Sequence, residues 1–207
     1  MPVRRPVASR RNNTAIACCE RRVTIDDVMD FVTMKRLNRA LATVVDELER
    51  HGFYDDKLER VDVYLTYVGG PYGWQHYATS GGIDIPSVSM ERILDLFRGG
   101  YTTLTDVLRH EFGHAVADTH RGLIRSRQFS EAYGAAHESK DEWEYDPDFH
   151  VSEYAATSVS EDFAEIFMLY LKHKGRLPNR YSTPYIRPKW RFVRALAAAI
   201  RRGKARW

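Results

Sequence analysis

The sequence between residues 103 and 118 contains two histidines four positions apart, and this spacing restricts how the chain can fold. The centre of the stretch reads His110, Glu111, Phe112, Gly113 and His114. Side chains four residues apart lie on the same face of an α-helix, so a helix here lets both imidazoles reach one metal ion. Two ring nitrogens are half of a tetrahedral ligand set. At least one more ligand must come from elsewhere in the chain.

The residues around the two histidines favour a helix. Thr103 and Asp106 have the spacing of an N-terminal capping pair. Apolar residues recur at helical spacing and form one face: Leu104, Val107, Leu108, Phe112 and Ala115. Glu111 lies about 100° around the helix from His110, which suits a general base that takes a proton from water beside the metal. The alternative is two surface histidines next to a solvated glutamate.

One candidate for the third ligand is His120, ten residues after His110. Metzincins place their third histidine at this distance, and the chain there turns sharply at a glycine in the seventh position after the first histidine. Ala117 occupies that position here. The Met-turn of that class also lacks a counterpart, because Met168 falls within a helical pattern.

The second candidate is a carboxylate on a later helix. Ser158 and Glu161 have capping-box spacing, and an apolar run continues from them toward His173. Glu161 and Glu165 are four residues apart and share a face. One carboxylate can bind zinc, while the other accepts the free N–H of a zinc-bound histidine. The alternative is a solvated pair, but the surrounding segment is apolar, and burying the two carboxylates there would require a cation.

These motifs together resemble a known family. The run from His110 to Val116, then Tyr154, then the run from Glu161 to Phe167 are similar to the catalytic domain of anthrax lethal factor and related gluzincin zinc metallopeptidases, and more distantly to thermolysin-like peptidases. The resemblance extends over residues 103–170, and nothing carries over for the divergent region 121–153. It implies a zincin-like metallopeptidase fold and peptide-bond hydrolysis.

The resemblance also implies roles for individual residues. It makes His110, His114 and Glu161 the Zn²⁺ ligands, with Glu111 as the general base. It makes Tyr154 the group that stabilises the oxyanion or protonates the leaving amine, and it makes Glu165 the partner of a metal ligand. Considered without the resemblance, Tyr154 reads as a packing residue.

Four other residues near these motifs carry weaker expectations. Asp118 lies one turn after His114, where it can either support a ligand or stand at an exposed helix end. His137, His150 and His173 have no supporting pattern, and we expect them on the surface.

The remaining patterns predict an α+β fold. Residues 61–68 alternate as a half-buried strand, and two short extended pieces follow at 74–79 and 82–85. Helical spacing covers 24–52 with a slip near Met34, which allows either one helix or two, and Ser89 caps a short helix to Phe97. We expect a small, mostly antiparallel sheet packed on the metal helix, with a second helix carrying Glu161. One of the short pieces is the expected edge for an extended substrate.

Composition and charge indicate one domain with basic ends. The chain has 207 residues, of which 43% are hydrophobic, enough for a sizeable core. We expect a basic flexible tail at 1–23, a catalytic domain at 24–177 and a basic segment at 178–207 whose helix docks on the body. Residues 1–22 contain six Arg, and residues 171–207 contain twelve Lys or Arg and no acid. Solubility or self-docking explains such ends, and contact with nucleic acid or an anionic surface is the alternative.

No disulfide framework or targeting segment is expected. The two cysteines, Cys18 and Cys19, are adjacent, so the metal ligands must be His and carboxylates. We expect no membrane span, and the absence of a signal-peptide core favours a cytoplasmic location or export by a route without a classical signal.

The sequence therefore predicts a zinc-dependent peptidase that acts on protein or peptide substrates. The alternatives are a metzincin-type peptidase that uses His120, and a non-catalytic zinc-stabilised module whose basic tails contact nucleic acid. Substrate identity, the role of the tails, activation by a partner and oligomeric state stay open.

Overall fold

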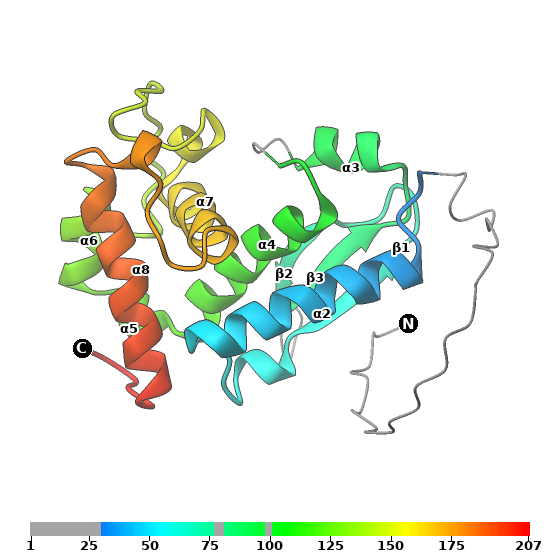
Figure 1. The fold of residues 1–207 in the computed structure, drawn as a ribbon, viewed down its shortest axis with the longest axis horizontal. Coiled ribbons are helices and arrows are strands. Elements are labelled where there is room, and N and C mark those ends of the chain that lie inside the picture. The colour runs from blue at the N-terminus through cyan, green and yellow to red at the C-terminus, as the bar shows by residue number, and fades with distance from the viewer. Residues whose placement is uncertain (1–29, 77–80, 98–100) are drawn as a thin grey trace, which may run out of the picture.

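A computed structural model describes residues 30–76, 81–97 and 101–207 of the chain. The fold is α+β, with one small sheet on one side and a group of C-terminal helices on the other (Figure 1). The elements are, in chain order, α2 (Met34–His51), η1 (Leu58–Arg60), β1 (Asp62–Thr66), β2 (Gly73–His76), β3 (Gly81–Pro86), α3 (Met90–Leu96), α4 (Leu104–Thr119), α5 (Arg121–Ile124), α6 (Arg127–Tyr133), η2 (Tyr154–Thr157), α7 (Val159–Lys172), η3 (Asn179–Tyr181) and α8 (Ile186–Arg201).

The sheet has three strands in the order β1-β3-β2. β2 and β3 pair antiparallel, with Trp74 opposite Ile83, whereas β1 and β3 pair parallel, with Val63 also opposite Ile83. The sheet is therefore mixed and not mostly antiparallel as expected. The two outer strands, β1 and β2, run in opposite directions, so β3 between them is parallel to one and antiparallel to the other.

Helix α4 lies at the centre of the fold and contacts α2, α7, β2 and β3. Its start is as predicted, since the Thr103 side chain accepts a hydrogen bond from the Asp106 N–H at 3.2 Å. The predicted apolar face is buried, and so are the polar residues His110 and Glu111 on the neighbouring faces. A single apolar stripe therefore underestimates the burial of a helix that is covered on several sides.

Helices α4 and α7 approach each other very closely at a glycine. A Cβ atom added to Gly113 would lie 3.0 Å from the Cα of Ala164 and 3.4 Å from the Cβ of Phe167. Glycine in a helix interior is destabilising relative to alanine, so its presence here needs a packing reason. The close approach of the two backbones supplies that reason.

A charged network joins α2, α4 and α7 on another side. The Arg109 guanidinium donates two hydrogen bonds to the Glu47 carboxylate, at 2.8 and 2.7 Å. Asp106, which is buried, accepts from Arg109 at 2.7 Å and from Lys172 at 2.9 Å. Buried charges are tolerated when they are paired in this way, so the network helps fix the relative positions of the three helices.

The structure differs from the expected helix at 24–52. Residues 24–29 lie outside the described part of the chain, and residues 30–33 are not helical. Phe31 instead forms an isolated β-bridge with Ser89. The helix begins at Met34, with Thr33 as its N-cap, and ends at Gly52 in the left-handed conformation. The slip in helical spacing at Met34 marks this start. The expected tail at 1–23 also lies outside the described residues.

The C-terminal helix α8 packs against α6 and α7. Its apolar residues are buried, including Trp190, Val193, Leu196 and Ile200. The Lys189 ammonium is also buried and forms a 2.6 Å ion pair with Asp162 of α7. Among the helices of the described residues, none combines the length and the apolar character that a membrane span requires.

Replacing Gly113 by Val tests the close approach of α4 and α7. Valine has a better helix propensity than glycine, so any loss of stability comes from the clash with Ala164. We expect the free energy of unfolding to fall by about 2 kcal/mol. Urea denaturation followed by circular dichroism, with excess chelator so that metal binding does not contribute, measures the change.

The matched control is Ala42→Val at an exposed position of α2. It introduces the same side chain on a helix without a facing backbone, and should cost less than about 1 kcal/mol. Equal losses in the two variants would contradict the packing role of Gly113.

Candidate metal centre

Two helices present three ligand atoms to one point. Helix α4 contributes His110 and His114, whose Nε2 atoms lie 3.0 Å apart. Helix α7 contributes Glu161, whose Oε2 lies 3.0 Å from the His110 Nε2 and 3.3 Å from the His114 Nε2. Glu161 is held in the first turn of α7, where its N–H donates to the N-cap Ser158 at 3.2 Å. The capping pair read from the sequence therefore places the carboxylate opposite the histidines.

The spacing of these atoms fits a tetrahedral metal. Ligand atoms about 2.0–2.1 Å from a zinc ion in tetrahedral geometry are separated by about 3.3 Å from one another, and the three observed separations are 3.0, 3.0 and 3.3 Å. A proton on one of these nitrogens can form a hydrogen bond to only one of the other two atoms, whereas one cation can bind all three atoms. Across residues 30–76, 81–97 and 101–207, this is the group of His, Cys and carboxylate side chains arranged to hold an ion.

Glu165 fixes the orientation of the His110 ring. Its Oε1 lies 3.0 Å from the His110 Nδ1, and its Oε2 accepts a hydrogen bond from the Ser152 hydroxyl at 2.8 Å. Burial lowers the pKa of His110, but the hydrogen bonds with Glu161 and Glu165 outweigh burial and raise the pKa to about 10. A metal that binds the near nitrogen, Nε2, would replace the proton there, and Glu165 would accept the proton that remains on Nδ1 and so fix the ring tautomer.

Glu111 stands beside this cluster and is attached to the sheet. The Trp74 backbone N–H in β2 donates to the Glu111 Oε2 at 2.6 Å. Gly73 lets the strand come this close, since a Cβ there would lie 3.2 Å from the same oxygen, and its φ of 79° favours glycine. The carboxylate thus points to the junction of α4 and β2, where it acts on the pKa of His110, Tyr101 and Tyr154.

Tyr154 lies over the candidate ligand His110, with the two ring centroids 5.8 Å apart. The side chain comes from η2, just before α7. Burial, followed by the nearby carboxylates of Glu161 and Glu111, raises the pKa of the Tyr154 phenol above its ordinary value. The phenol therefore stays protonated and can donate a hydrogen bond toward the cluster.

A second tyrosine at the site was not predicted. Tyr101 is buried, and its ring packs edge-on against His110 with centroids 5.3 Å apart. Burial and the charges of Glu165 and Glu111 raise the pKa of its phenol. Ser152 and the Trp74 amide were also missed. None of the three has a local signal, because each reaches the site through tertiary packing from a different segment.

The structure places His120 elsewhere. Its Nε2 lies 3.0 Å from Asp55 Oδ2, and its Nδ1 lies 3.0 Å from the Thr119 hydroxyl and 3.3 Å from the Val116 carbonyl. Ala117 lies within α4, which continues to Thr119 without the turn that a metzincin needs. His120 therefore supports the end of α4 and does not join the cluster.

Asp118 does not contact the metal ligands either. It accepts a hydrogen bond from the Arg121 side chain at 2.7 Å, and its other oxygen lies 3.3 Å from the His76 ring. Asp118 lies at the end of α4, as the second interpretation had it, but it is partly buried and not exposed.

Two histidines expected on the surface are instead enclosed. His150 is buried, and its ring stacks on Trp143 with centroids 5.8 Å apart. His137 is half-buried against Phe129 and Phe163, and burial together with the charge of His114 lowers its pKa to about 4. The expectation was wrong because neither lies in a periodic element from which burial could be read. His173 ends α7, as the capping pattern predicted, and is partly buried.

Searches against models of protein families, curated protein sequences and solved structures found no match to this chain. The chemistry of the site therefore has to be argued from its own residues.

Separate variants of the two candidate third ligands test the metal centre. We expect the chain to bind one zinc ion, and Glu161→Ala to weaken zinc binding by more than about 100-fold, since loss of an outer partner alone costs about 10–100-fold. His120→Ala should bind zinc as the parent chain does, because its ring bonds to Asp55. Competition with a chromophoric chelator measures both affinities.

Circular dichroism of both variants checks that each remains folded. The assignment of Glu161 fails if Glu161→Ala keeps the parent affinity, or if His120→Ala loses zinc while its spectrum is unchanged.

Proposed function

We propose that this protein is a zinc-dependent peptidase of the gluzincin type. The observation that carries the proposal is the convergence of His110, His114 and Glu161 at tetrahedral spacing, with Glu111 and Tyr154 beside them. A zinc ion held there would supply a Lewis acid that polarises a carbonyl and acidifies water. The rest of the reaction depends on side chains of the chain.

Glu111 is the group that moves the proton. Its carboxylate is held at the edge of the cluster by the Trp74 N–H, and it does not need to bind the metal. In hydrolysis it accepts a proton from the attacking water and delivers it to the leaving nitrogen. Burial between α4 and β2 keeps the carboxylate in one place for both transfers.

Tyr154 provides charge stabilisation. A phenol that remains protonated can donate to the oxygen of the scissile carbonyl as negative charge develops on it. Glu165, fixed by Ser152, keeps the His110 ring oriented throughout the reaction. Each of these groups is attached to a rigid element, which favours the preorganisation that catalysis requires.

Strand β2 offers a place for the substrate backbone. It pairs with β3 along one edge, and no described strand covers the other edge. The strand begins at Gly73 and Trp74, which contact Glu111. An extended peptide that pairs with this free edge would pass beside the metal cluster, by the strand-addition mode of peptide recognition.

A non-catalytic, zinc-stabilised module is the second candidate. Structural zinc sites have four protein ligands, whereas catalytic sites have three and an open position. The cluster contains three ligands among the described residues, and a purely structural site has no use for a carboxylate held like that of Glu111. These two features favour the enzyme.

The variant Glu111→Gln tests the general base. Glutamine can still accept the Trp74 N–H, so folding and zinc affinity should match those of the parent chain. Peptide cleavage should fall by about 10²–10⁴-fold because the proton acceptor is gone. The measurement is cleavage of a degenerate peptide library followed by mass spectrometry, with and without chelator.

Cleavage by the zinc-loaded parent chain that chelator abolishes is the positive result. If the parent chain binds zinc but cleaves no library member, the non-catalytic module is favoured. If Glu111→Gln cleaves as fast as the parent chain, the role of Glu111 is refuted.

The variant Tyr154→Phe tests the hydrogen bond to the developing charge. It removes only the hydroxyl and keeps the ring that packs on His110. We expect kcat to fall by about 10²–10³-fold with KM nearly unchanged, because the contact forms mainly in the transition state. A rise in KM at constant kcat would show instead that the phenol binds the substrate.

Tyr101→Phe is a matched removal of a hydroxyl from the other tyrosine that packs on His110. Its effect on kcat should be smaller, because this proposal assigns the transition-state contact to Tyr154.

A further inference from the structure

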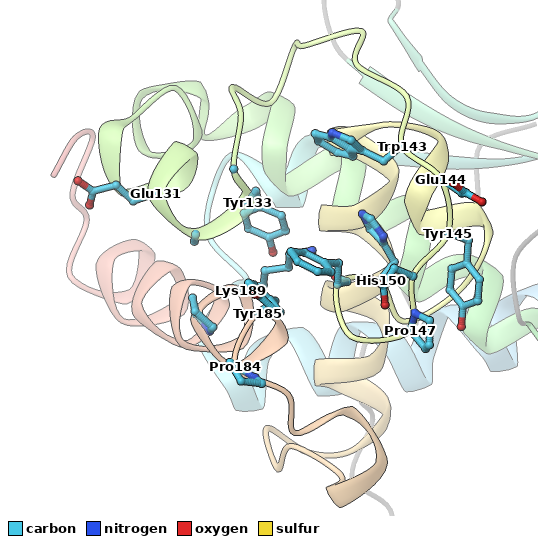
Figure 2. Close-up of a pocket in the computed structure, with 15 residues that line it drawn as sticks. Glu131, Tyr133, Trp143, Glu144, Tyr145, Pro147, His150, Pro184, Tyr185 and Lys189 are labelled. Atoms are coloured by element: carbon cyan, nitrogen blue, oxygen red, sulfur yellow. The ribbon is translucent and has the colours of Figure 1, made fainter.

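A second concave site lies on the other side of α7. Glu161 of α7 faces the histidines of α4, whereas its neighbour Asp162 bonds Lys189 of α8. A cavity of about 720 Å³ opens above that ion pair. Figure 2 shows its walls coming from α6, from the segment before η2 and from the start of α8. The volume is within the range of small-ligand and peptide sites.

The walls of this cavity carry a group of aromatic side chains. Three large aromatic side chains remain well exposed at it, Tyr145 at 41%, Phe149 at 39% and Tyr185 at 48%. Phe149 and Tyr185 stack with ring centroids 3.7 Å apart, and Trp143 stacks on His150 behind them. Monomeric proteins rarely expose a contiguous apolar patch of this kind, and such patches often mark binding sites.

The floor of the cavity carries no free charge. The Lys189 ammonium bonds Asp162 and the Phe149 carbonyl, both at 2.6 Å. Burial and the charge of Lys189 lower the pKa of His150 to about 4, so its ring is neutral near pH 7. The His150 Nδ1 and the Tyr133 hydroxyl are buried and, among the described residues, have no hydrogen-bond partner, so the wall retains two unsatisfied polar atoms.

The edge of the cavity is acidic. Residues 141–148 contain five acids and no Lys or Arg. Two of these acids, Glu144 and Asp146, line the cavity, and neither forms an ion pair within the described part of the chain. Asp146 lies close enough to act on the pKa of His150. The third lining acid, Glu131, is paired with Arg127 on the surface, and Figure 2 shows it on the opposite side from Glu144.

We propose that this cavity binds a short basic segment of a partner protein, with one Arg or Lys side chain among the aromatic rings. Cations are attracted to aromatic faces, and the unpaired carboxylates of Glu144 and Asp146 supply the opposite charge. Apolar neighbours of the cation would pack on Phe149 and Tyr185. The site is independent of the proposed function, because no metal ligand lines it.

A peptide-binding experiment on the full chain tests this site. The probe is the acetylated and amidated pentapeptide Ala-Leu-Arg-Leu-Ala, and its neutral counterpart has citrulline in place of Arg. Isothermal titration at low salt should show the Arg peptide binding at least about tenfold more tightly than the citrulline peptide. The difference should shrink when the salt is raised to about 1 M, where charges are screened beyond about 3 Å.

Charge-reversal variants locate the binding. Glu144→Lys combined with Asp146→Lys should weaken binding of the Arg peptide by at least about tenfold, since two attractive charges become repulsive. The matched control is Glu49→Lys with Asp56→Lys, which changes the net charge equally at exposed positions outside the cavity. It should bind the peptide as the parent chain does.

Three results would overturn the proposal: equal binding of the Arg and citrulline peptides, no binding of either, or equal losses in the two charge-reversal variants. A full chain with Arg4, Arg5, Arg10 and Arg11 changed to Gln adds one more test. If it binds the peptide more tightly than the parent chain, the chain's own N-terminal residues compete for the cavity, and the assignment to a partner is wrong.

The titrations are repeated with zinc and with chelator. Equal affinities support a site separate from the metal centre, whereas dependence on zinc would overturn that separation. Failure of the peptide to bind says nothing against zinc binding or cleavage, so the two proposals fail on different measurements.

Discussion

The structure depends on the contact between α4 and α7, where a buried imidazole meets one buried and one partly buried carboxylate. Burying a carboxylate without a partner is costly, yet Glu165 is buried and Glu161 is mostly so. Both are positioned against His110, one on each ring nitrogen. Gly113 lets the two backbones approach closely enough for these short side chains to meet. Packing and polar chemistry at this contact therefore depend on each other.

The acidic side chains of α7 bond to partners on two different helices. Glu161 and Glu165 face the histidines of α4, and Asp162 faces Lys189 of α8. Near its other end Lys172 bonds Asp106 of α4. A helix held by charged contacts on two sides has little freedom to rotate, because any rotation would leave a buried charge unpaired. This constraint holds the ligand carboxylate in place without a metal.

The segment from Trp143 to Thr157 joins the two sites described above. Its first half forms a wall of the aromatic cavity, and its second half brings Ser152 and Tyr154 to the metal cluster. The Trp143 N–H donates to the Ala156 carbonyl and so closes the segment on itself.

The sequence by itself determined the elements whose signals are local. The spacing of His110 and His114 and the caps at Thr103 and Ser158 depend on neighbours within one helical turn, so both helices begin where predicted. Ala117 already argued against His120 as the third ligand, but only the tertiary structure decided that Glu161 contacts the histidines and that His120 bonds Asp55, because both contacts join segments far apart in the chain. It likewise decided the strand directions and the contacts of Tyr101 and the Trp74 amide, since these depend on how separate segments pack together.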